Sequence, residues 1–378
     1  MENEILIYDI ETFPNFHSFC GYDPKRDVWY EYCVYNNKRQ LVEYISFLNS
    51  LCRRNYVLVG FNNLAYDYPV IHHILNNVSY FSDLPIDQCL KAIYRISQNV
   101  INVPYSIIDK KDQMIDQIDL FKIHHFNNQA KRSSLKDIEC AMDFPNVQDL
   151  PKKYYEKVLP EEIGMIMKYN RNDVLATKWL YDRSIENINL RKQISKEYGI
   201  DVINADDPKI GSEIFAKIIC DELKISRYDL DKMRTYHKKI VVKDLIFPNI
   251  KFETDVFNDV LKTFNSLVIE NTKGEFKHET LINDLHLVYG SGGIHSFNKP
   301  CIKIADKNNL IIDADITSMY PNIGIRYRKY PRHLSESFCT IYESVFDKRA
   351  EAKRNGIKAI NEGLKLALNG ELNYLSIN

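Results

Sequence analysis

The stretch Ile5-Leu6-Ile7-Tyr8-Asp9-Ile10-Glu11-Thr12-Phe13 places two carboxylates inside an apolar run. The alternation of β-branched, aromatic and acidic residues predicts a strand, in which residues two apart project from the same face. Asp9 and Glu11 would then lie side by side. Because neighbouring carboxylates repel each other, such a pair either caps an exposed strand end or holds a divalent metal ion between its members.

The composition is that of a globular chain with room for two domains. It has 378 residues, of which 45% are hydrophobic and 27% charged, and a formal net charge of −1. No apolar run approaches the roughly 20 residues that span a bilayer, so a cytoplasmic protein without a membrane partner is expected. The eight cysteines stand singly, which predicts neither a zinc site nor a disulfide framework. The near-neutral charge still allows a local basic channel for nucleic acid.

The segments after the first strand predict alternating strands and helices. Two further β-rich runs, 16–22 and 27–35, would complete an antiparallel meander. A helix over 38–52 and a short buried strand over 56–61 follow. A later strand is expected at 114–121. Helices are expected at 68–75, 133–142, 161–179 with an extension to about 199, and 207–223. Strand and helix alternation on an acid-bearing first strand indicates an α/β nuclease fold.

Two later segments add functional side chains. Asp67 stands at the start of the predicted helix 68–75, where an acid is also favourable for structural reasons alone. Tyr169 and Asp173 are four residues apart in the predicted helix 161–179 and share one of its faces. A phenol and a carboxylate would therefore point the same way.

The ordered set of these segments resembles the proofreading 3′→5′ exonuclease domain of DNA polymerases, a ribonuclease-H-like fold. The family's three motifs are Asp-x-Glu on the first strand, Asn shortly before Phe/Tyr-Asp, and Tyr-x3-Asp on a late helix; the chain matches them at 9–11, 62–67 and 169–173. The resemblance implies that four acids bind two Mg²⁺ or Mn²⁺ ions: Asp9, Glu11, Asp67 and Asp173.

The resemblance implies two further roles in this domain. Tyr169 would orient the attacking water, and Asn62 or Asn63 would hold the DNA strand that is trimmed, since the motif's spacing fits either. The chemistry suits these residue types, because phosphodiester hydrolysis uses two metal ions about 3.5–4 Å apart and hard Mg²⁺ prefers carboxylate oxygens.

A second group of motifs lies in the carboxyl-terminal half. The run 310–316 predicts an apolar strand that ends in an acid and turns into a helix. The glycine-rich segment 289–293 predicts a tight hairpin. Two antiparallel helices are expected over 343–354 and 358–370, joined by the turn Asn355-Gly356.

The second group resembles family B DNA polymerases. Asp315-Ile316-Thr317-Ser318-Met319-Tyr320-Pro321 is similar to motif A, with Met319 where the family has Leu. The segment 289–293 is similar to the Tyr-x-Gly-Gly element, with one residue added. The residues from Lys365 to Gly370 are similar to the start of motif B, and the predicted helix pair to the fingers.

This second resemblance implies a partial palm in which Asp315 is a Mg²⁺ ligand. Arg349 and Lys353 share a helix face that Lys365 would meet from the second helix, and three converging cations favour an anion such as a triphosphate. The implied ligands of the incoming deoxynucleoside triphosphate are Ser318, Tyr320, Arg349, Lys353, Lys365 and Asn369. The implied contacts to template DNA are Tyr289, Gly292 and Gly293.

The resemblance ends after Gly370, where motif B would continue with x-Tyr-Gly and motif C would later supply a second palm carboxylate. Nucleotidyl transfer with Asp315 alone is expected to fail. We therefore expect an exonuclease domain over 1–200 and a partial polymerase domain over 201–378, with the reading frame interrupted inside motif B. A second polypeptide carrying the rest of the polymerase would be a partner. The compact fingers favour a viral or plasmid enzyme.

Two other functions compete with this interpretation. A stand-alone 3′→5′ exonuclease explains the first domain but leaves motifs A and B as coincidences. A non-catalytic DNA-binding or assembly subunit would leave the acids idle. The basic and aromatic segment 229–243 is either solvated surface or a contact to a DNA backbone.

Overall fold

The computed structural model describes residues 4–103, 107–128, 132–233, 238–270, 276–290, 293–297, 299–316 and 318–370. The chain divides into two compact units, Met1–Asp207 and Pro208–Asn378. Among the described residues, no helix combines the length and the apolar character needed to cross a membrane.

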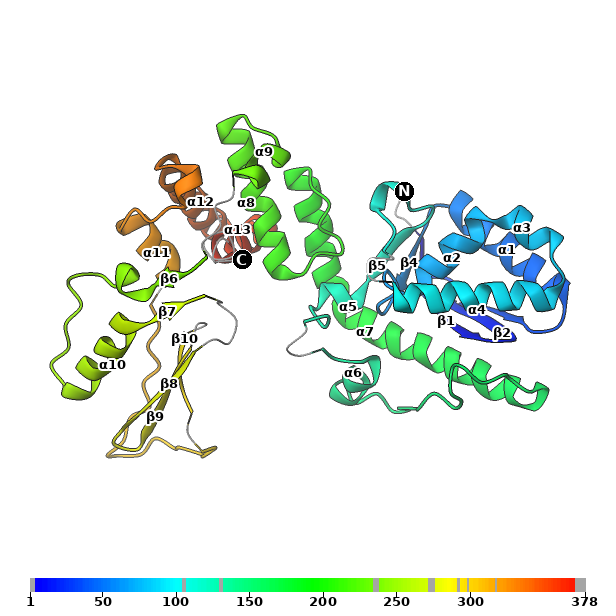
Figure 1. The fold of residues 1–378 in the computed structure, drawn as a ribbon, viewed down its shortest axis with the longest axis horizontal. Coiled ribbons are helices and arrows are strands. Elements are labelled where there is room, and N and C mark those ends of the chain that lie inside the picture. Colours follow the sequence, from blue (N-terminus) through cyan, green and yellow to red (C-terminus); the bar gives the residue numbers. More distant parts are fainter. Residues whose placement is uncertain are drawn as a thin grey trace. The chain divides into compact units, whose positions relative to one another are not determined.

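The amino-terminal unit is built on a mixed five-stranded sheet of order β3-β2-β1-β4-β5 (Figure 1). Its strands are β1 (Glu4–Phe13), β2 (Phe16–Asp23), β3 (Val28–Val34), β4 (Tyr56–Gly60) and β5 (Asp116–Asp119). The first three form the antiparallel meander that the sequence predicts, whereas β4 runs parallel to β1 and β5 parallel to β4. The α/β class predicted from the sequence is confirmed.

Alternate residues of β1 serve opposite faces of this sheet. Leu6, Tyr8 and Ile10 are buried against one helical layer, and Ile7 is buried against the other. The first layer contains α1 (Lys38–Arg53), α2 (Asp67–Asn76), α3 (Val78–Asp83) and α4 (Ile86–Asn102). The second contains α5 (Leu120–Ile123), α6 (Leu135–Ala141) and α7 (Ile163–Tyr198). With a period of two, Asp9 and Glu11 project to the same side as Ile7, toward α7.

The long helix α7 ends at Gly199, whose φ of 64° is the left-handed conformation that suits a helix carboxyl terminus. The chain then returns to the edge of the sheet. The Oδ1 atom of Asn204 accepts a hydrogen bond from the backbone N–H of Asp119 (2.7 Å), and its Nδ2 donates to the carbonyl of Gln117 (2.9 Å). Because these bonds cover the open edge of β5, the first unit extends to Asp207, beyond the predicted boundary at residue 200.

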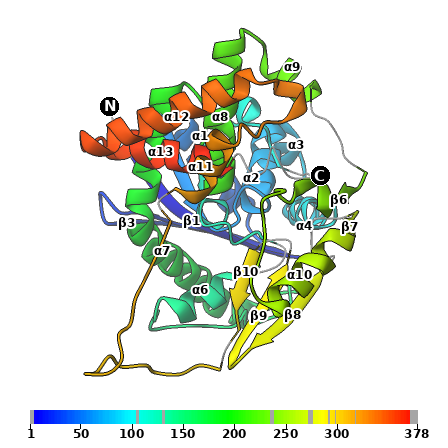
Figure 2. The ribbon, with the colours of Figure 1, turned by 90° about the vertical axis from the view of Figure 1, so that its left-hand side faces the viewer.

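The carboxyl-terminal unit contains a helical cluster and a small sheet. The cluster consists of α8 (Asp207–Leu223), α11 (Met319–Arg326), α12 (Ser337–Arg354) and α13 (Lys358–Gly370), which lie together in Figure 2. The Phe215 ring packs against those of Phe338 and Tyr342, and a Cβ at Gly211 would come within 2.0 Å of the Leu366 carbonyl oxygen. The predicted helix pair is thus present, with Gly356 at a φ of 69° in its turn.

The small sheet has the order β10-β9-β8 and lies beside α10 (Asp255–Ser266) (Figure 2). Its strands are β8 (Lys277–Ile282), β9 (Leu285–Gly290) and β10 (Gly293–Ser296). Gly290 pairs with Gly293 across a two-residue connection, which is the tight hairpin predicted from the glycines. The shorter elements of this unit are α9 (Arg227–Lys232) and the paired strands β6 (Ile240–Val241) and β7 (Val268–Ile269).

The strand predicted over 310–316 is not formed. Residues 299–316 have no regular secondary structure, and Leu310 and Ile312 are 84% and 79% exposed. A strand needs a neighbour for its backbone hydrogen bonds, and no strand in the described part of the chain pairs with this segment. The prediction from apolar composition alone was therefore wrong, although α11 follows where a helix was expected.

Candidate metal centre

The candidate site lies where β1 extends beyond its parallel neighbour. β4 pairs with β1 only over Glu4–Ile7 and ends at Gly60. Farther along β1, the backbone N–H of Ile10 donates to Oδ1 of Asp67 (3.2 Å). The Asp67 carboxylate thus takes the place of a strand neighbour and is held at the edge of β1.

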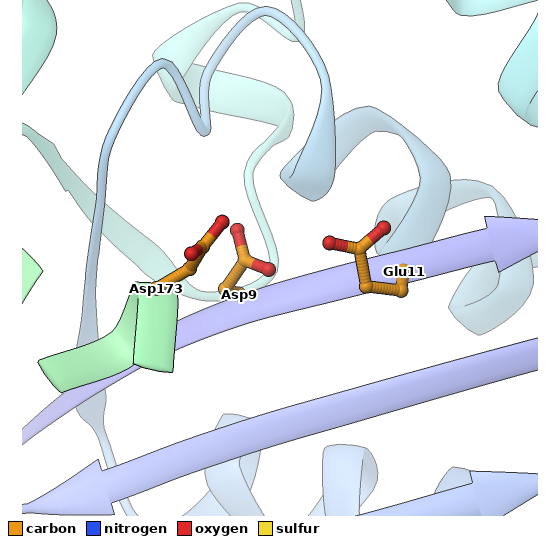
Figure 3. Close-up of side chains that lie close together, drawn as sticks. All are labelled: Asp9, Glu11 and Asp173. Atoms are coloured by element: carbon orange, nitrogen blue, oxygen red, sulfur yellow. The ribbon is translucent and has the colours of Figure 1, made fainter. Parts of the chain in front are cut away.

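Three further acids come together beside Asp67. Asp9 and Glu11 project from β1, Asp173 projects from α7, and the three carboxylates offer oxygens that lie within 4.8 Å of one another (Figure 3). This is the single cluster of three or more His, Cys, Asp or Glu side chains within the described residues that could hold a metal ion.

The three acids line a cavity of about 540 Å³. Its other lining residues are Ile10, Phe61, Asn62, Tyr66, Asp67, Phe121, Arg132, Ser133, Ser134, Leu135 and Asp137. The structure therefore brings all four predicted metal ligands of the first domain to one cavity, although Asp67 already accepts a backbone hydrogen bond.

Burial and mutual repulsion disfavour the charged forms of these acids. Burial, with the neighbouring acids, raises the pKa of Asp9 and Glu11 well above the usual range. Burial also raises the pKa of Asp67 and of Asp173 to about 7. Four carboxylates with raised pKa values lie at one cavity, and a cation bound between them would stabilise their charged forms. The all-oxygen donor set fits a hard divalent cation.

Neighbouring residues on α7 orient the acids. Asn170 is fully buried, and its Nδ2 donates to Oδ2 of Asp9 (2.5 Å). Burial, with the nearby Asp173, Glu11 and Asp9 carboxylates, raises the pKa of the Tyr169 phenol, so this phenol stays protonated beside the acids. The sequence pattern pointed to Tyr169 but gave no role to Asn170. The short spacing between Asn170 and Asp173 in the helix was the available signal.

The structure separates the two asparagines that the sequence left equivalent. Asn62 has a φ of 60° and lines the cavity. Asn63 is fully buried, and its Nδ2 donates to Oε1 of Gln117 (2.9 Å). The Asn63 side chain therefore belongs to the core beneath the loop, and of the two asparagines only Asn62 lines the cavity; a DNA contact by either stays a prediction.

Asp119 was missed by the sequence analysis. It is fully buried at the end of β5, and burial raises its pKa to about 6. Its carboxylate accepts hydrogen bonds from the backbone N–H groups of Asn62 (2.9 Å), Leu64 (3.3 Å) and Phe121 (3.0 Å). Asp119 thereby holds the loop that follows β4. The signal in the sequence was an acid near the end of the strand predicted over 114–121.

The predicted palm residues do not form a comparable centre. Asp315 is exposed in the segment without regular structure and belongs to no metal-ligating cluster of three among the described residues. Ser318 adopts the left-handed conformation (φ 50°) before α11, and Nη1 of Arg349 reaches its Oγ at 3.5 Å. Tyr320 is 52% exposed.

The remaining cations predicted to converge have separate surroundings. Nζ of Lys365 lies 3.4 Å from Oε2 of Glu362, one turn earlier on the same helix. Lys353 and Asn369 are exposed. The structure thus links Arg349 to Ser318 but gives Lys365 an acidic neighbour, Glu362.

The predicted template contacts are only partly described. Tyr289 is buried, its ring packs against those of Phe264 and His278, and its hydroxyl accepts from Thr280 (3.2 Å). The ring therefore fills the interior between α10 and the small sheet, and a contact of Tyr289 to template DNA stays a prediction. Gly293 begins β10, whereas Gly292 lies outside the described residues. Residues 234–237 of the basic segment also lie outside them, and Lys238 and Lys239 are exposed.

Comparison with known proteins adds no relative: no protein-family model matches the chain, and no curated protein matches it significantly. Assignment of a function therefore depends on the geometry of the acidic cavity.

Proposed function

We propose that the amino-terminal unit is a metal-dependent 3′→5′ exonuclease that trims single-stranded 3′ ends of DNA. The observation that carries this proposal is the meeting of Asp9, Glu11 and Asp173, with Asp67 beside them, in one cavity. A meander followed by parallel strands, in the order β3-β2-β1-β4-β5, supports a ribonuclease-H-like fold.

The residues around the acidic cavity have different roles in the proposed reaction. Asp9, Glu11, Asp67 and Asp173 would hold Mg²⁺ or Mn²⁺, which supplies an activated water and stabilises the leaving 3′ oxygen. Asn170 fixes the Asp9 carboxylate, and the phenol of Tyr169, kept protonated by burial beside the acids, would orient a water molecule. Asn62 lines the cavity and is available to the substrate strand.

For the carboxyl-terminal unit we propose part of a family B DNA polymerase. The contact between Arg349 and Ser318, together with the α12–α13 hairpin, supports a site for a deoxynucleoside triphosphate opposite a primer–template. Polymerisation would need a further carboxylate beside Asp315, which a second polypeptide could contribute. The exposed position of Asp315 favours the alternative of a stand-alone exonuclease.

The test of the exonuclease is shortening of a 5′-labelled single-stranded oligonucleotide in Mg²⁺ or Mn²⁺. We expect a ladder of shorter products, and a loss on the order of 100-fold or more in Asp9→Ala because a metal ligand is removed. Asp87→Ala is the matched control, since Asp87 is an exposed acid that pairs with Lys91 on α4. A circular single strand should remain intact.

The proposal fails if the wild-type chain leaves the oligonucleotide intact with either metal. It also fails if Asp9→Ala and Asp87→Ala shorten it equally well, because the activity would then come from another site or a contaminant.

A further inference from the structure

An arginine that the sequence analysis did not select stands at the rim of the acidic cavity. Arg132 is exposed and lines the cavity together with Ser133 and Ser134. Among the described residues that line this cavity, it is the sole cation, whereas Asp9, Glu11, Asp67, Asp137 and Asp173 are acids. Its positive charge is therefore opposite to that of the five acids that line the cavity.

The Arg132 side chain rests on a rigid support. Its guanidinium carbon lies 5.9 Å from the centroid of the Phe121 ring. Phe121 is 5% exposed, its ring packs edge-on against Phe61 (5.1 Å), and its backbone N–H donates to Asp119. An arginine held against an aromatic face keeps its N–H groups at the edge of the guanidinium plane free to bind an anion.

Asp137 is the cavity-lining acid nearest to Arg132 in the sequence, and its carboxylate is hydrogen-bonded to Ser134. The Asp137 carboxylate accepts hydrogen bonds from the backbone N–H (2.8 Å) and the Oγ (2.7 Å) of Ser134 in the capping box of α6. These bonds lower the pKa of Asp137. Asp137 thus serves the start of α6, and its role does not depend on Arg132.

A cavity lined by acids repels a DNA strand wherever bound cations do not neutralise it. Metal ions held by Asp9, Glu11 and Asp173 would attract the scissile phosphate, but the adjoining phosphates carry charges of their own. Guanidinium groups bind phosphate oxygens with paired N–H donors and are the strongest such partners among side chains.

We propose that Arg132 binds a phosphate that adjoins the scissile phosphodiester, and so holds the 3′ end of a single strand in the cavity. This inference rests on the proposed exonuclease function and names the group that would bind the substrate backbone. Arg132 would act on binding of the strand and leave the metal chemistry to the acids.

The first test compares DNA binding in Ca²⁺, which limits cleavage, for the wild type, Arg132→Ala and Arg132→Lys. We expect Arg132→Ala to bind a fluorescein-labelled single strand about 10-fold more weakly, with the slope of log K against log salt reduced by about 0.7 to 1. Arg132→Lys should keep the slope but recover only part of the affinity, because lysine lacks the paired donors. In Mg²⁺, KM should rise about as much as affinity falls, with kcat nearly unchanged.

Arg39→Ala is the matched control, because Arg39 is an exposed arginine on α1 that pairs with Glu43. It should change neither the affinity nor the salt slope. Circular dichroism and the thermal midpoint of each variant show whether folding is intact, and Arg132→Gln supplies a second neutral variant.

The second test locates the phosphate. Oligonucleotides with one neutral methylphosphonate, placed in turn at each linkage near the 3′ end, should include one that weakens binding to the wild type but not to Arg132→Ala. Equal affinity and salt slope in wild type and Arg132→Ala, while the wild type still shortens DNA, overturn the role of Arg132 alone. A wild type that neither binds nor shortens DNA overturns the exonuclease and this inference together.

Discussion

Individual side chains determine how much charge the acidic cavity can hold. Asp67 and Asp173 have pKa values raised to about 7, chiefly by burial, from an ordinary value of 3.8. Asn170 donates a hydrogen bond to the Asp9 carboxylate and so offsets part of the free energy that burial and repulsion add to its charged form. Such a cavity lowers the stability of the metal-free protein, because partly buried acids close to one another disfavour their charged forms.

This balance predicts a pH dependence. The folded, metal-free protein keeps protons on these acids that the unfolded chain has released, so its stability falls as the pH rises from about 4 through 7. We expect Asp67→Asn to remove part of this decline, since each pKa unit corresponds to about 1.4 kcal/mol. The measurement is the urea midpoint from pH 5 to 8 in EDTA and in Mg²⁺.

The difference between wild type and Asp67→Asn isolates the effect from other titrating groups. Mg²⁺ should flatten the wild-type decline, because a bound cation stabilises the charged forms of the acids. A wild type that gains stability relative to Asp67→Asn as the pH rises in EDTA would contradict the assignment.

The sequence predicts the positions of these side chains unevenly. Alternation along β1 places Asp9 and Glu11 on one face, and the helical spacing places Tyr169 with Asp173. Spacing could not separate Asn62 from Asn63, because the choice depends on a positive φ at Asn62 that turns the loop. Spacing also gave no role to Arg132, which the fold brings to the cavity, or to Asp119, which holds the loop beside it.

At the scale of elements, the cavity exists because strands of unequal length lie side by side. β1 continues past the end of β4, and the loop after Gly60 must turn without strand neighbours. Asp119, at the end of β5, accepts hydrogen bonds from two backbone N–H groups of this loop, those of Asn62 and Leu64, and so replaces the missing pairing.

Removal of that carboxylate should loosen the loop. Asp119→Ala leaves buried N–H groups without their acceptor, and each unpaired group costs about 1–3 kcal/mol, so we expect the free energy of unfolding to fall by about 2 kcal/mol or more. Asp116→Ala is the matched control on the same strand, because Asp116 is 47% exposed and pairs with Lys110 at the surface. Urea unfolding of both variants measures the difference.

A loss in Asp116→Ala as large as that in Asp119→Ala would show that β5 itself, and not the loop, depends on these acids. The Asp119→Ala variant should also shorten DNA more slowly, since Asn62 would no longer be held at the cavity.

Elements with a local signal were predictable, and those that need a distant neighbour were not. The meander, α7 and the α12–α13 pair carry their periodicity and turn residues within the segment. The segment 310–316 carries an equally apolar composition, yet a strand also needs a neighbour that supplies hydrogen bonds. Tyr289 shows the same limit, because only the packing of α10 on the small sheet reveals that its ring is internal.

At the scale of the whole molecule, the two units differ in how completely they assemble a centre for metal chemistry. The first gathers four carboxylates from β1, α2 and α7 around one cavity. In the second, Asp315 is exposed and belongs to no metal-ligating cluster of three among the described residues. Arg349 does contact Ser318, which lies three residues after Asp315. Two-metal transfer of a nucleotide requires carboxylates on both ions.

We therefore expect this chain, given a 5′-labelled primer–template, Mg²⁺ and the four deoxynucleoside triphosphates, to shorten the primer and not to lengthen it. Asp315→Ala should shorten it at the wild-type rate, because Asp315 takes no part in the cavity of the first unit. Asp9→Ala should leave the primer at its original length. Lengthening that persists in Asp9→Ala and disappears in Asp315→Ala would instead show that another acid joins Asp315 when DNA is bound, and that the second unit completes its own centre on the substrate.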